Sequence, residues 1–257
     1  MPSWSRLLAM TACLSACGSE SAGLFDLERP PEKVCMREAT PETYEIYFVL
    51  DVSGSMTPFL TKLRNEIVSF TESIPERDAQ GRRTRVDYYV VAFVNDVKWF
   101  PEESPRLTSA IGVQDALDRA IEAGRGDLNL TQRTYNAEPA ENLLDAITSV
   151  TASAPTADAR LMLIATDAPF AESPTILSSN IAVRTSFTRV HQALADADFR
   201  VHAFTPELLD GVTREYRGTP ALTDLPGSSK TSLRALVEGE VDIATRLSLI
   251  AEEASCN

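Results

Sequence analysis

Apolar residues follow two alternating patterns along the chain from residue 44 onward. Short runs rich in β-branched and aromatic residues are typical of buried strands, and they occur at 44–50, 86–94, 161–165 and 199–204. Between and after these runs, apolar residues spaced three or four positions apart predict amphipathic helices. The predicted helices include Leu63, Leu117, Ile147, Val190 and Leu247.

A hairpin interrupts this alternation after the second run. Asn95 and Asp96 form a turn signal, and "VKWF" at 97–100 follows as an antiparallel partner strand. The pattern predicts an α/β fold: a doubly wound, mostly parallel sheet with one antiparallel edge strand and helices on both faces. Residues 206–232 show no clear period, and we expect a long loop there with a final short strand near 231–236.

Composition narrows the class of protein. The chain has 257 residues, 44% of them hydrophobic, which is enough to bury one large core or at most two modest ones. Its formal net charge is −13. Such an acidic surface argues against nucleic acid as a partner and against adsorption to anionic lipid.

Residues 7–16 form a short apolar segment after Arg6. Ten residues are too few to span a bilayer but fit the apolar core of a secretory signal. The segment runs into "LSAC", Leu14 to Cys17, which resembles the lipobox of bacterial lipoproteins. The resemblance implies a signal peptide at 1–16 and a lipid on Cys17. The polar, proline-punctuated residues that follow show no apolar period, and we expect a lipid-anchored tether at 17–43. The alternative is an ordinary hydrophobic N-terminus with incidental cysteines.

The residues after Cys17 are Gly18 and Ser19, so the aspartate of the inner-membrane retention signal is missing. We therefore expect a bacterial outer-membrane or cell-surface location, with the lipid as the only membrane contact. The mature chain would keep Cys35 and Cys256, close to the two ends of the domain at 44–257. Secretion permits a disulfide between them, although two free buried thiols remain the alternative.

The stretch "DVSGS", residues 51–55, ends the first apolar run with three alternating oxygen-bearing side chains. Gly54 with Ser53 could form a turn, and Thr57 with Pro58 could start a helix, but neither role needs this alternation. Asp167 also follows an apolar strand, and ligands bind at the carboxyl ends of strands in such sheets. Carboxylates and hydroxyls are hard donors that suit Mg²⁺, or Ca²⁺ and Mn²⁺. For Asp167, a simple turn or helix cap is the alternative.

"DVSGS" resembles the Asp-x-Ser-x-Ser signature of the von Willebrand factor type A domain, which carries a metal-ion-dependent adhesion site (MIDAS). Three further stretches are similar to that family: "VVAFVNDVKWF" at 90–100, "ENLLDAI" at 141–147 and "LMLIATDAPF" at 161–170. Glu141 stands where many members have threonine, and this resembles the integrin β-subunit version. The resemblance implies a metal site formed by Asp51, Ser53, Ser55, Glu141 and Asp167, the last either directly or through water.

Two other features bear on metal binding. Asn136 and Glu138 align with ligands of a second, neighbouring site in the family, but two such residues in a loop rich in Asn, Glu and Pro favour a plain turn over a second site. "MTPFL" at 56–60 lacks the aspartate pair of the integrin β third site, so we expect that site to be absent. Glu141 itself has an alternative as a solvated acid at a helix N-terminus.

The resemblance implies a surface-tethered module that binds a protein ligand through an acidic side chain of that ligand. We predict no enzyme activity, because Ser53 and Ser55 have no histidine or lysine base in motif spacing. The alternatives are a metal-assisted hydrolase on the same rim, with Glu141 as base, and a periplasmic assembly factor. The sequence leaves the oligomeric state open.

Overall fold

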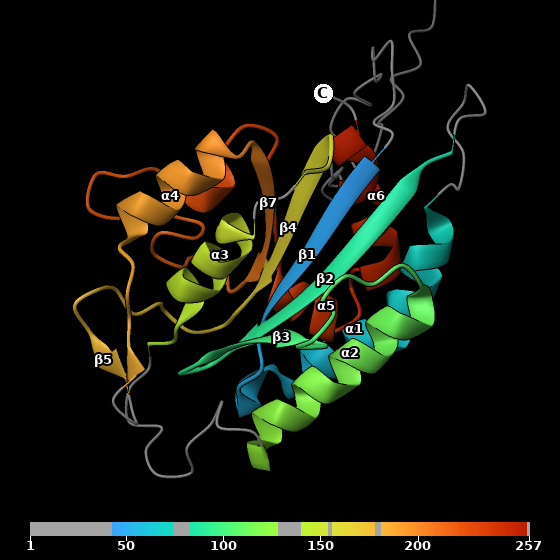
Figure 1. Ribbon diagram of the computed structural model, residues 1–257, viewed down its shortest axis with the longest axis horizontal. Helices are drawn as coiled ribbons and strands as arrows, with labels where there is room; N and C mark the ends of the chain where they lie inside the picture. Colours follow the sequence, from blue (N-terminus) through green and yellow to red (C-terminus); the bar gives the residue numbers. More distant parts are fainter. Residues whose placement is uncertain (1–42, 75–82, 128–139, 154–155, 178–180, 256–257) are drawn as a thin grey trace, which may run out of the picture. The chain divides into compact units, whose positions relative to one another are not determined.

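The computed structural model describes residues 43–74, 83–127, 140–153, 156–177 and 181–255, all within the unit Met36–Asn257 (Figure 1). Six strands form the main sheet in the order β3-β2-β1-β4-β7-β8. Their bounds are β1 (Thr43–Asp51), β2 (Arg85–Phe93), β3 (Val97–Phe100), β4 (Ala159–Ala165), β7 (Phe199–Thr205) and β8 (Ser229–Ser232). Only β3 pairs antiparallel, so the predicted mostly parallel sheet with one antiparallel edge strand is confirmed.

Helices cover both faces of the sheet. They are α1 (Thr57–Ser73), α2 (Ala110–Glu122), α3 (Leu143–Ala152), α4 (Phe187–Asp196), α5 (Leu233–Val237) and α6 (Ile243–Ser255). Shorter turns are η1 (Gly54–Met56), the π-helical η2 (Ala123–Asp127) and η4 (Leu222–Asp224). A separate two-stranded ribbon consists of β5 (Ile176–Leu177) and β6 (Ile181–Ala182). Figure 1 shows α3 and α4 on one side of the sheet, with α1, α2, α5 and α6 on the other.

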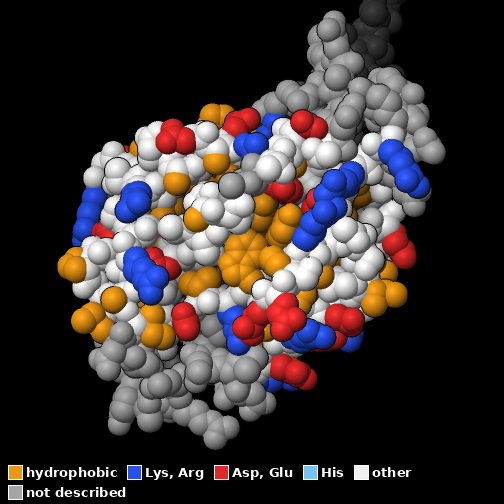
Figure 2. Space-filling view, in the orientation of Figure 1, with side chains coloured by type: hydrophobic (Ala, Val, Ile, Leu, Met, Phe, Trp, Pro, Cys, Tyr) orange, Lys and Arg blue, Asp and Glu red, His pale blue; other side chains and the backbone are white. Residues whose placement is uncertain are grey.

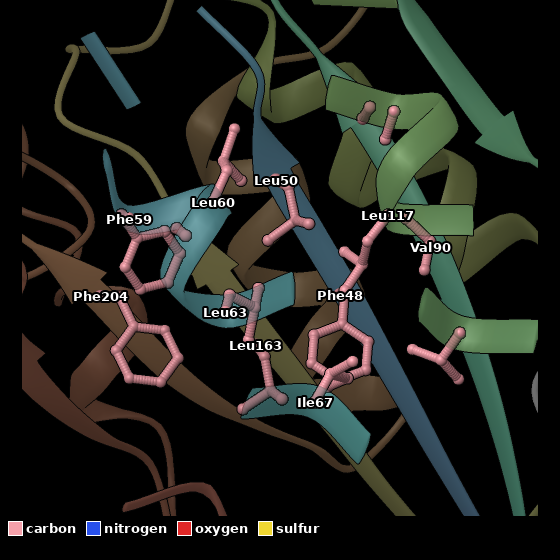
Figure 3. Close-up of a cluster of buried hydrophobic side chains, with 14 of the residues drawn as sticks. Phe48, Leu50, Phe59, Leu60, Leu63, Ile67, Val90, Leu117, Leu163 and Phe204 are labelled. Atoms are coloured by element: carbon pink, nitrogen blue, oxygen red, sulfur yellow. The ribbon is translucent and has the colours of Figure 1, made fainter. Parts of the chain in front are cut away.

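Strand β1 is buried on both faces, which explains its uninterrupted apolar run. Alternate side chains point to opposite sides, so Phe48 and Leu50 enter the core under α1 and α2 (Figure 3), while Tyr47 and Val49 enter the core under α3 and α4. Full burial of each large side chain contributes about 1.5–3 kcal/mol. The paired cores fix the register of β1, and with it the position of Asp51 at the strand end.

Two boundaries differ from the sequence predictions. The last strand is β8 at Ser229–Ser232, and helix α5 begins where the predicted strand at 231–236 would continue. Ser232 ends the strand and caps the helix, its hydroxyl accepting from the backbone N–H of Ala235. Thr57 is not an N-cap, because η1 already winds the chain and Thr57 is the first residue of α1.

The predicted signal peptide at 1–16 lies outside the described residues, as does the tether at 17–43 except for Thr43. Within the described ranges, every helix is too short or too polar to cross a bilayer.

Candidate metal centre

The candidate centre lies at the carboxyl ends of the neighbouring strands β1 and β4. Asp51 is the last residue of β1 and is completely buried. Asp167 follows β4 by two residues, and Glu141 precedes α3 by the same interval. The fold brings these three acids to one rim of the sheet, although Asp51 and Asp167 are more than a hundred residues apart in the sequence. This is the rim where ligands bind in open α/β sheets.

Hydrogen bonds give the loop after Asp51 its shape. The backbone N–H of Ser53 donates to Oδ1 of Asp51 at 2.8 Å. The hydroxyls of Ser53 and Ser55 lie 3.0 Å apart, and Ser55 Oγ donates to Oδ1 of Asp167 at 3.1 Å. Ser53 stands at the N-terminal cap of η1, yet its side chain makes no capping bond. The two hydroxyls are therefore directed toward the rim rather than used to start the helix.

Thr166, the residue directly after β4, supports the centre, and it was not predicted from the sequence. Its buried hydroxyl donates to Oδ2 of Asp51 at 3.0 Å, so both oxygens of Asp51 are held, one from each neighbouring loop. The only available signal was a hydroxyl residue directly before Asp167. In a β-branched strand pattern, a terminal threonine gives no indication of this contact.

Gly124 is the second residue that the sequence did not reveal. It lies in η2, and a Cβ added there would sit 2.0 Å from the carbonyl oxygen of Val52. Any larger residue would therefore push against the backbone between Asp51 and Ser53. A glycine just after an amphipathic helix is more readily interpreted as a helix end.

Glu141 is positioned by its main chain. Its N–H donates to the carbonyl of Pro169 at 2.8 Å, and the N–H of Ala171 donates to the carbonyl of Glu141 at 2.8 Å. The neighbouring Asn142 N–H donates to the carbonyl of Val94 at 2.7 Å. These bonds tie the start of α3 to the loops after β4 and β2. Oε2 of Glu141 is buried and has no hydrogen-bond partner within the described structure.

The buried carboxyl of Asp51 and the half-buried carboxyl of Glu141 disfavour each other's ionised form. Burial raises the pKa of Asp51, although hydrogen bonds from its neighbours partly lower it. Burial and the nearby carboxylates of Asp51 and Asp167 raise the pKa of Glu141 to about 10. Carboxylates that share a dry site can both be ionised only if a positive charge lies between or beside them. The described residues supply no such charge through an ion pair to Asp51 or Glu141.

A divalent cation fits this donor set by chemistry. The unpartnered Oε2 of Glu141 is an available carboxylate oxygen, and two serine hydroxyls and Asp167 lie on the same rim. Counted by His, Cys, Asp and Glu alone, the described residues contain no group of three that could hold a metal ion. Ser53 and Ser55 would therefore have to complete the set, as hard oxygen ligands for Mg²⁺ or Ca²⁺.

Several predicted functional residues lie outside the described part of the chain. They are the possible second-site ligands Asn136 and Glu138, the lipidated Cys17, and the disulfide pair Cys35 and Cys256.

Comparison with known proteins shows the fold and no more. No protein-family model and no curated protein sequence matches the chain. Among solved structures, the human COPII-coat protein Sec24c is similar over 83% of this chain and 33% of its own, at 14% identity and a TM-score of 0.53. Proximal thread matrix protein 1 from the mussel byssus is similar in two structures, at 12% and 10% identity and TM-scores of 0.50 and 0.51.

The two mussel structures are matched over 84% and 83% of this chain and over 47% and 46% of their own chains. The chain therefore spans about a third to a half of the length of the structures it resembles. At these identities the likeness defines the fold class, a Rossmann-like α/β arrangement of the von Willebrand factor type A kind.

Proposed function

We propose that this chain is a protein-binding module that holds one divalent cation at Asp51, Ser53, Ser55, Glu141 and Asp167. The observation that carries the proposal is the meeting of the buried Asp51 carboxyl with Glu141, whose buried Oε2 has no hydrogen-bond partner within the described structure. Removing carboxylates from water without a compensating charge is costly. Bound cation would supply that charge and an open coordination position for a carboxylate of the partner.

The chain's own residues hold the donors in place. Ser53 and Thr166 each donate to a different oxygen of Asp51, which fixes the carboxyl plane at the end of β1. Ser55 donates to Asp167 and so joins the β1 and β4 loops. Pre-arranged donors lose little conformational freedom when a ligand binds, which favours affinity.

The partner's acidic side chain follows from charge. The whole chain carries a formal net charge of −13, so its long-range electrostatic field would repel an acidic ligand rather than recruit one. Only a local positive charge at the rim would make an acidic ligand acceptable. With three carboxylates and a divalent cation the centre would keep a formal charge of −1. We therefore expect modest affinity for the partner, or a preference for Ca²⁺ over Mg²⁺.

We propose binding rather than catalysis. The hydrogen bonds of Ser53 and Ser55 run to each other and to Asp167, and in the described ranges no histidine or lysine contacts either hydroxyl. A serine nucleophile needs an adjacent base. We expect no hydrolytic turnover from the purified chain. The alternative function, a metal-assisted hydrolase, would require such turnover.

Attachment and the disulfide extend the proposal to the chain ends. We propose that Cys17 carries lipid and tethers the module to the outer membrane or cell surface, and that Cys35 pairs with Cys256. Palmitate labelling that persists in Cys17→Ser protein would contradict the first. Peptide mapping without reductant decides the second, and recovery of both cysteines as free thiols would contradict it.

Capture of a partner tests the function. Tagged full chain would be used in pull-downs from the envelope fraction of the cells that make it, with and without EDTA. We expect capture to be lost with EDTA, in Asp51→Ala, and in Ser53→Ala combined with Ser55→Ala. The matched control is Ser73→Ala with Ser248→Ala, which removes a hydroxyl pair between α1 and α6, 2.6 Å apart. Capture that survives all three treatments would place the binding surface elsewhere.

A further inference from the structure

A pocket of about 800 Å³ opens on the face of the sheet that carries α3 and α4. In Figure 1, the N-terminal halves of β1 and β2 have no helix in front of them beside α3. Figure 2 shows a hollow of apolar side chains at the centre of this face, with charged side chains around it. The pocket shares no residue with the metal centre. Glu45, in its lining, and Asp51 lie six residues apart on β1, about 20 Å at 3.3 Å per residue.

Three aromatic residues form one wall of the pocket. Tyr47 and Tyr89 are register partners on β1 and β2, and their rings stack with centroids 4.5 Å apart. Trp99 on β3 meets both rings edge-on, at 6.4 Å from Tyr47 and 6.1 Å from Tyr89. Tyr47 is buried, whereas Tyr89 and Trp99 are half-buried and line the open side. A sheet face that keeps two large aromatic rings accessible is typical of a binding surface.

A buried carboxylate lies beside these rings. Glu45 is 6% exposed, and it accepts from the hydroxyl of Tyr47 at 3.0 Å and from the backbone N–H of Thr156 at 3.4 Å. Neither donor is charged.

The basic side chains near the pocket already have other partners. Lys98 pairs with Glu102 at 2.6 Å, while Arg85 and Arg106 both pair with Asp87, at 2.7 and 2.9 Å. Across the described residues, Glu45 is thus a buried acid at a pocket wall without an ion pair of its own. Such a group gains most from a cation that enters the pocket.

We propose that this pocket receives an arginine side chain of a polypeptide partner. A guanidinium can stack on an aromatic face and donate to a carboxylate at the same time, which a compact ammonium does less well. Arginine and aromatic residues also dominate the strongest contacts of protein interfaces. The chain's net charge of −13 would attract a basic segment at long range. This site is independent of the metal centre and needs no cation there.

Fluorescence of Trp99 provides a direct test. The chain has two tryptophans, Trp4 and Trp99, so Trp4→Phe in the full chain leaves Trp99 as the only reporter. The probe is Nα-acetylarginine amide, which mimics an arginine within a chain, and Nα-acetylcitrulline amide is its neutral isostere. We expect a saturable change in Trp99 emission with the arginine probe, unaffected by EDTA, and none with citrulline at the same concentrations.

Two variants separate the roles of charge and stacking. Glu45→Gln should weaken binding of the arginine probe about tenfold or more, since a charge-assisted hydrogen bond is lost. Tyr89→Leu keeps the carboxylate of Glu45 but removes the stacking ring, so it should weaken binding of the arginine probe severalfold. This variant preserves the test if Glu45→Gln does not fold. Glu207→Gln is the control, because it changes the net charge equally on a residue outside the pocket lining.

The contradicting outcomes are equally definite. Equal responses to arginine and citrulline probes would overturn the proposal, and so would unchanged binding in a folded Glu45→Gln protein. In the proposed binding mode the α-carboxylate of free arginine gains nothing, because it would lie beside Glu45 and Glu102. Tighter binding of free arginine than of the capped probe would therefore indicate a metabolite site. That result would overturn the assignment to a polypeptide partner.

Discussion

Ser55 donates a 3.1 Å hydrogen bond to Oδ1 of Asp167 across 112 residues of sequence. This contact joins the loop after β1 to the loop after β4, the two neighbouring strands at the middle of the sheet. It puts a hydroxyl and a carboxylate next to the buried Asp51, with Glu141 close by. The candidate centre is therefore a product of the sheet topology rather than of one local motif.

Gly124 should be essential for the shape of the Asp51 loop. Gly124→Ala would place a methyl group 2.0 Å from the carbonyl of Val52, which forces the backbone to move. We expect the free energy of unfolding to fall by about 1–3 kcal/mol, as for other overpacked sites, and cation affinity to fall as well. Gly54→Ala is the control, since a Cβ there has no atom within 4 Å. Equal stability of the two variants in urea unfolding would contradict the contact.

Glu141→Gln should have opposite effects on stability and on metal binding. Burial and the Asp51 carboxylate raise the pKa of Glu141 to about 10, so the metal-free chain must take up a proton there when it folds at pH 7. Glutamine avoids this cost, so the metal-free variant should be as stable as the wild type or more stable. Cation affinity should fall at least about tenfold, because a charged ligand is lost. Urea unfolding with and without cation measures both. A metal-free variant that is strongly destabilised would show that the Glu141 carboxylate has a structural partner.

His202 should make stability depend on pH in the acid range. It is buried between Ser229 and Thr231, with ring nitrogens 2.7 and 3.0 Å from their hydroxyls. Burial, with a smaller effect of Arg246, lowers the pKa of His202 from 6.5 to about 3. Between pH 6.5 and 3 the unfolded chain therefore binds the proton and the folded chain does not, so stability from this group is lost as pH falls.

One such proton corresponds to a slope of about 1.4 kcal/mol per pH unit. Other groups also contribute to acid unfolding, so the comparison is between variants. His202→Gln should have a shallower dependence of unfolding free energy on pH than the wild type over this range. His191→Gln, which removes the other histidine and leaves the His202 contacts intact, is the control. Parallel curves for wild type and His202→Gln would contradict the prediction.

The sequence was sufficient to predict the sheet because its central strands are buried on both faces. Runs such as 44–50 are short and rich in β-branched and aromatic residues, which favours strands over helices. The hairpin signal at Asn95 and Asp96 identified the antiparallel edge. The acids of the candidate centre were found for a related reason. Asp51 and Asp167 directly follow such runs, and parallel strands end on the same rim.

What the sequence did not reveal depends on contacts between distant segments. The approach of Gly124 to Val52 and the bond from Thr166 to Asp51 exist only after the strands and helices pack. Ser232 is both the last residue of β8 and the N-cap of α5, and the local pattern did not show this boundary. The predicted strand at 231–236 therefore lies too far toward the C-terminus. The pocket at Tyr89 and Trp99 was also hidden, because a period of two shows which side chains share a face but not whether a helix covers it.

Cation binding by the full chain is the most direct test of the central claim. Isothermal titration with Mg²⁺, Ca²⁺ and Mn²⁺ should show one divalent ion per chain. Binding should be lost in Asp51→Ala and in the similarly sized Asp51→Asn, with circular dichroism confirming that at least one of them remains folded. Binding by a folded Asp51 variant equal to that of the wild type would contradict the account, as would a wild-type chain that takes up no divalent cation.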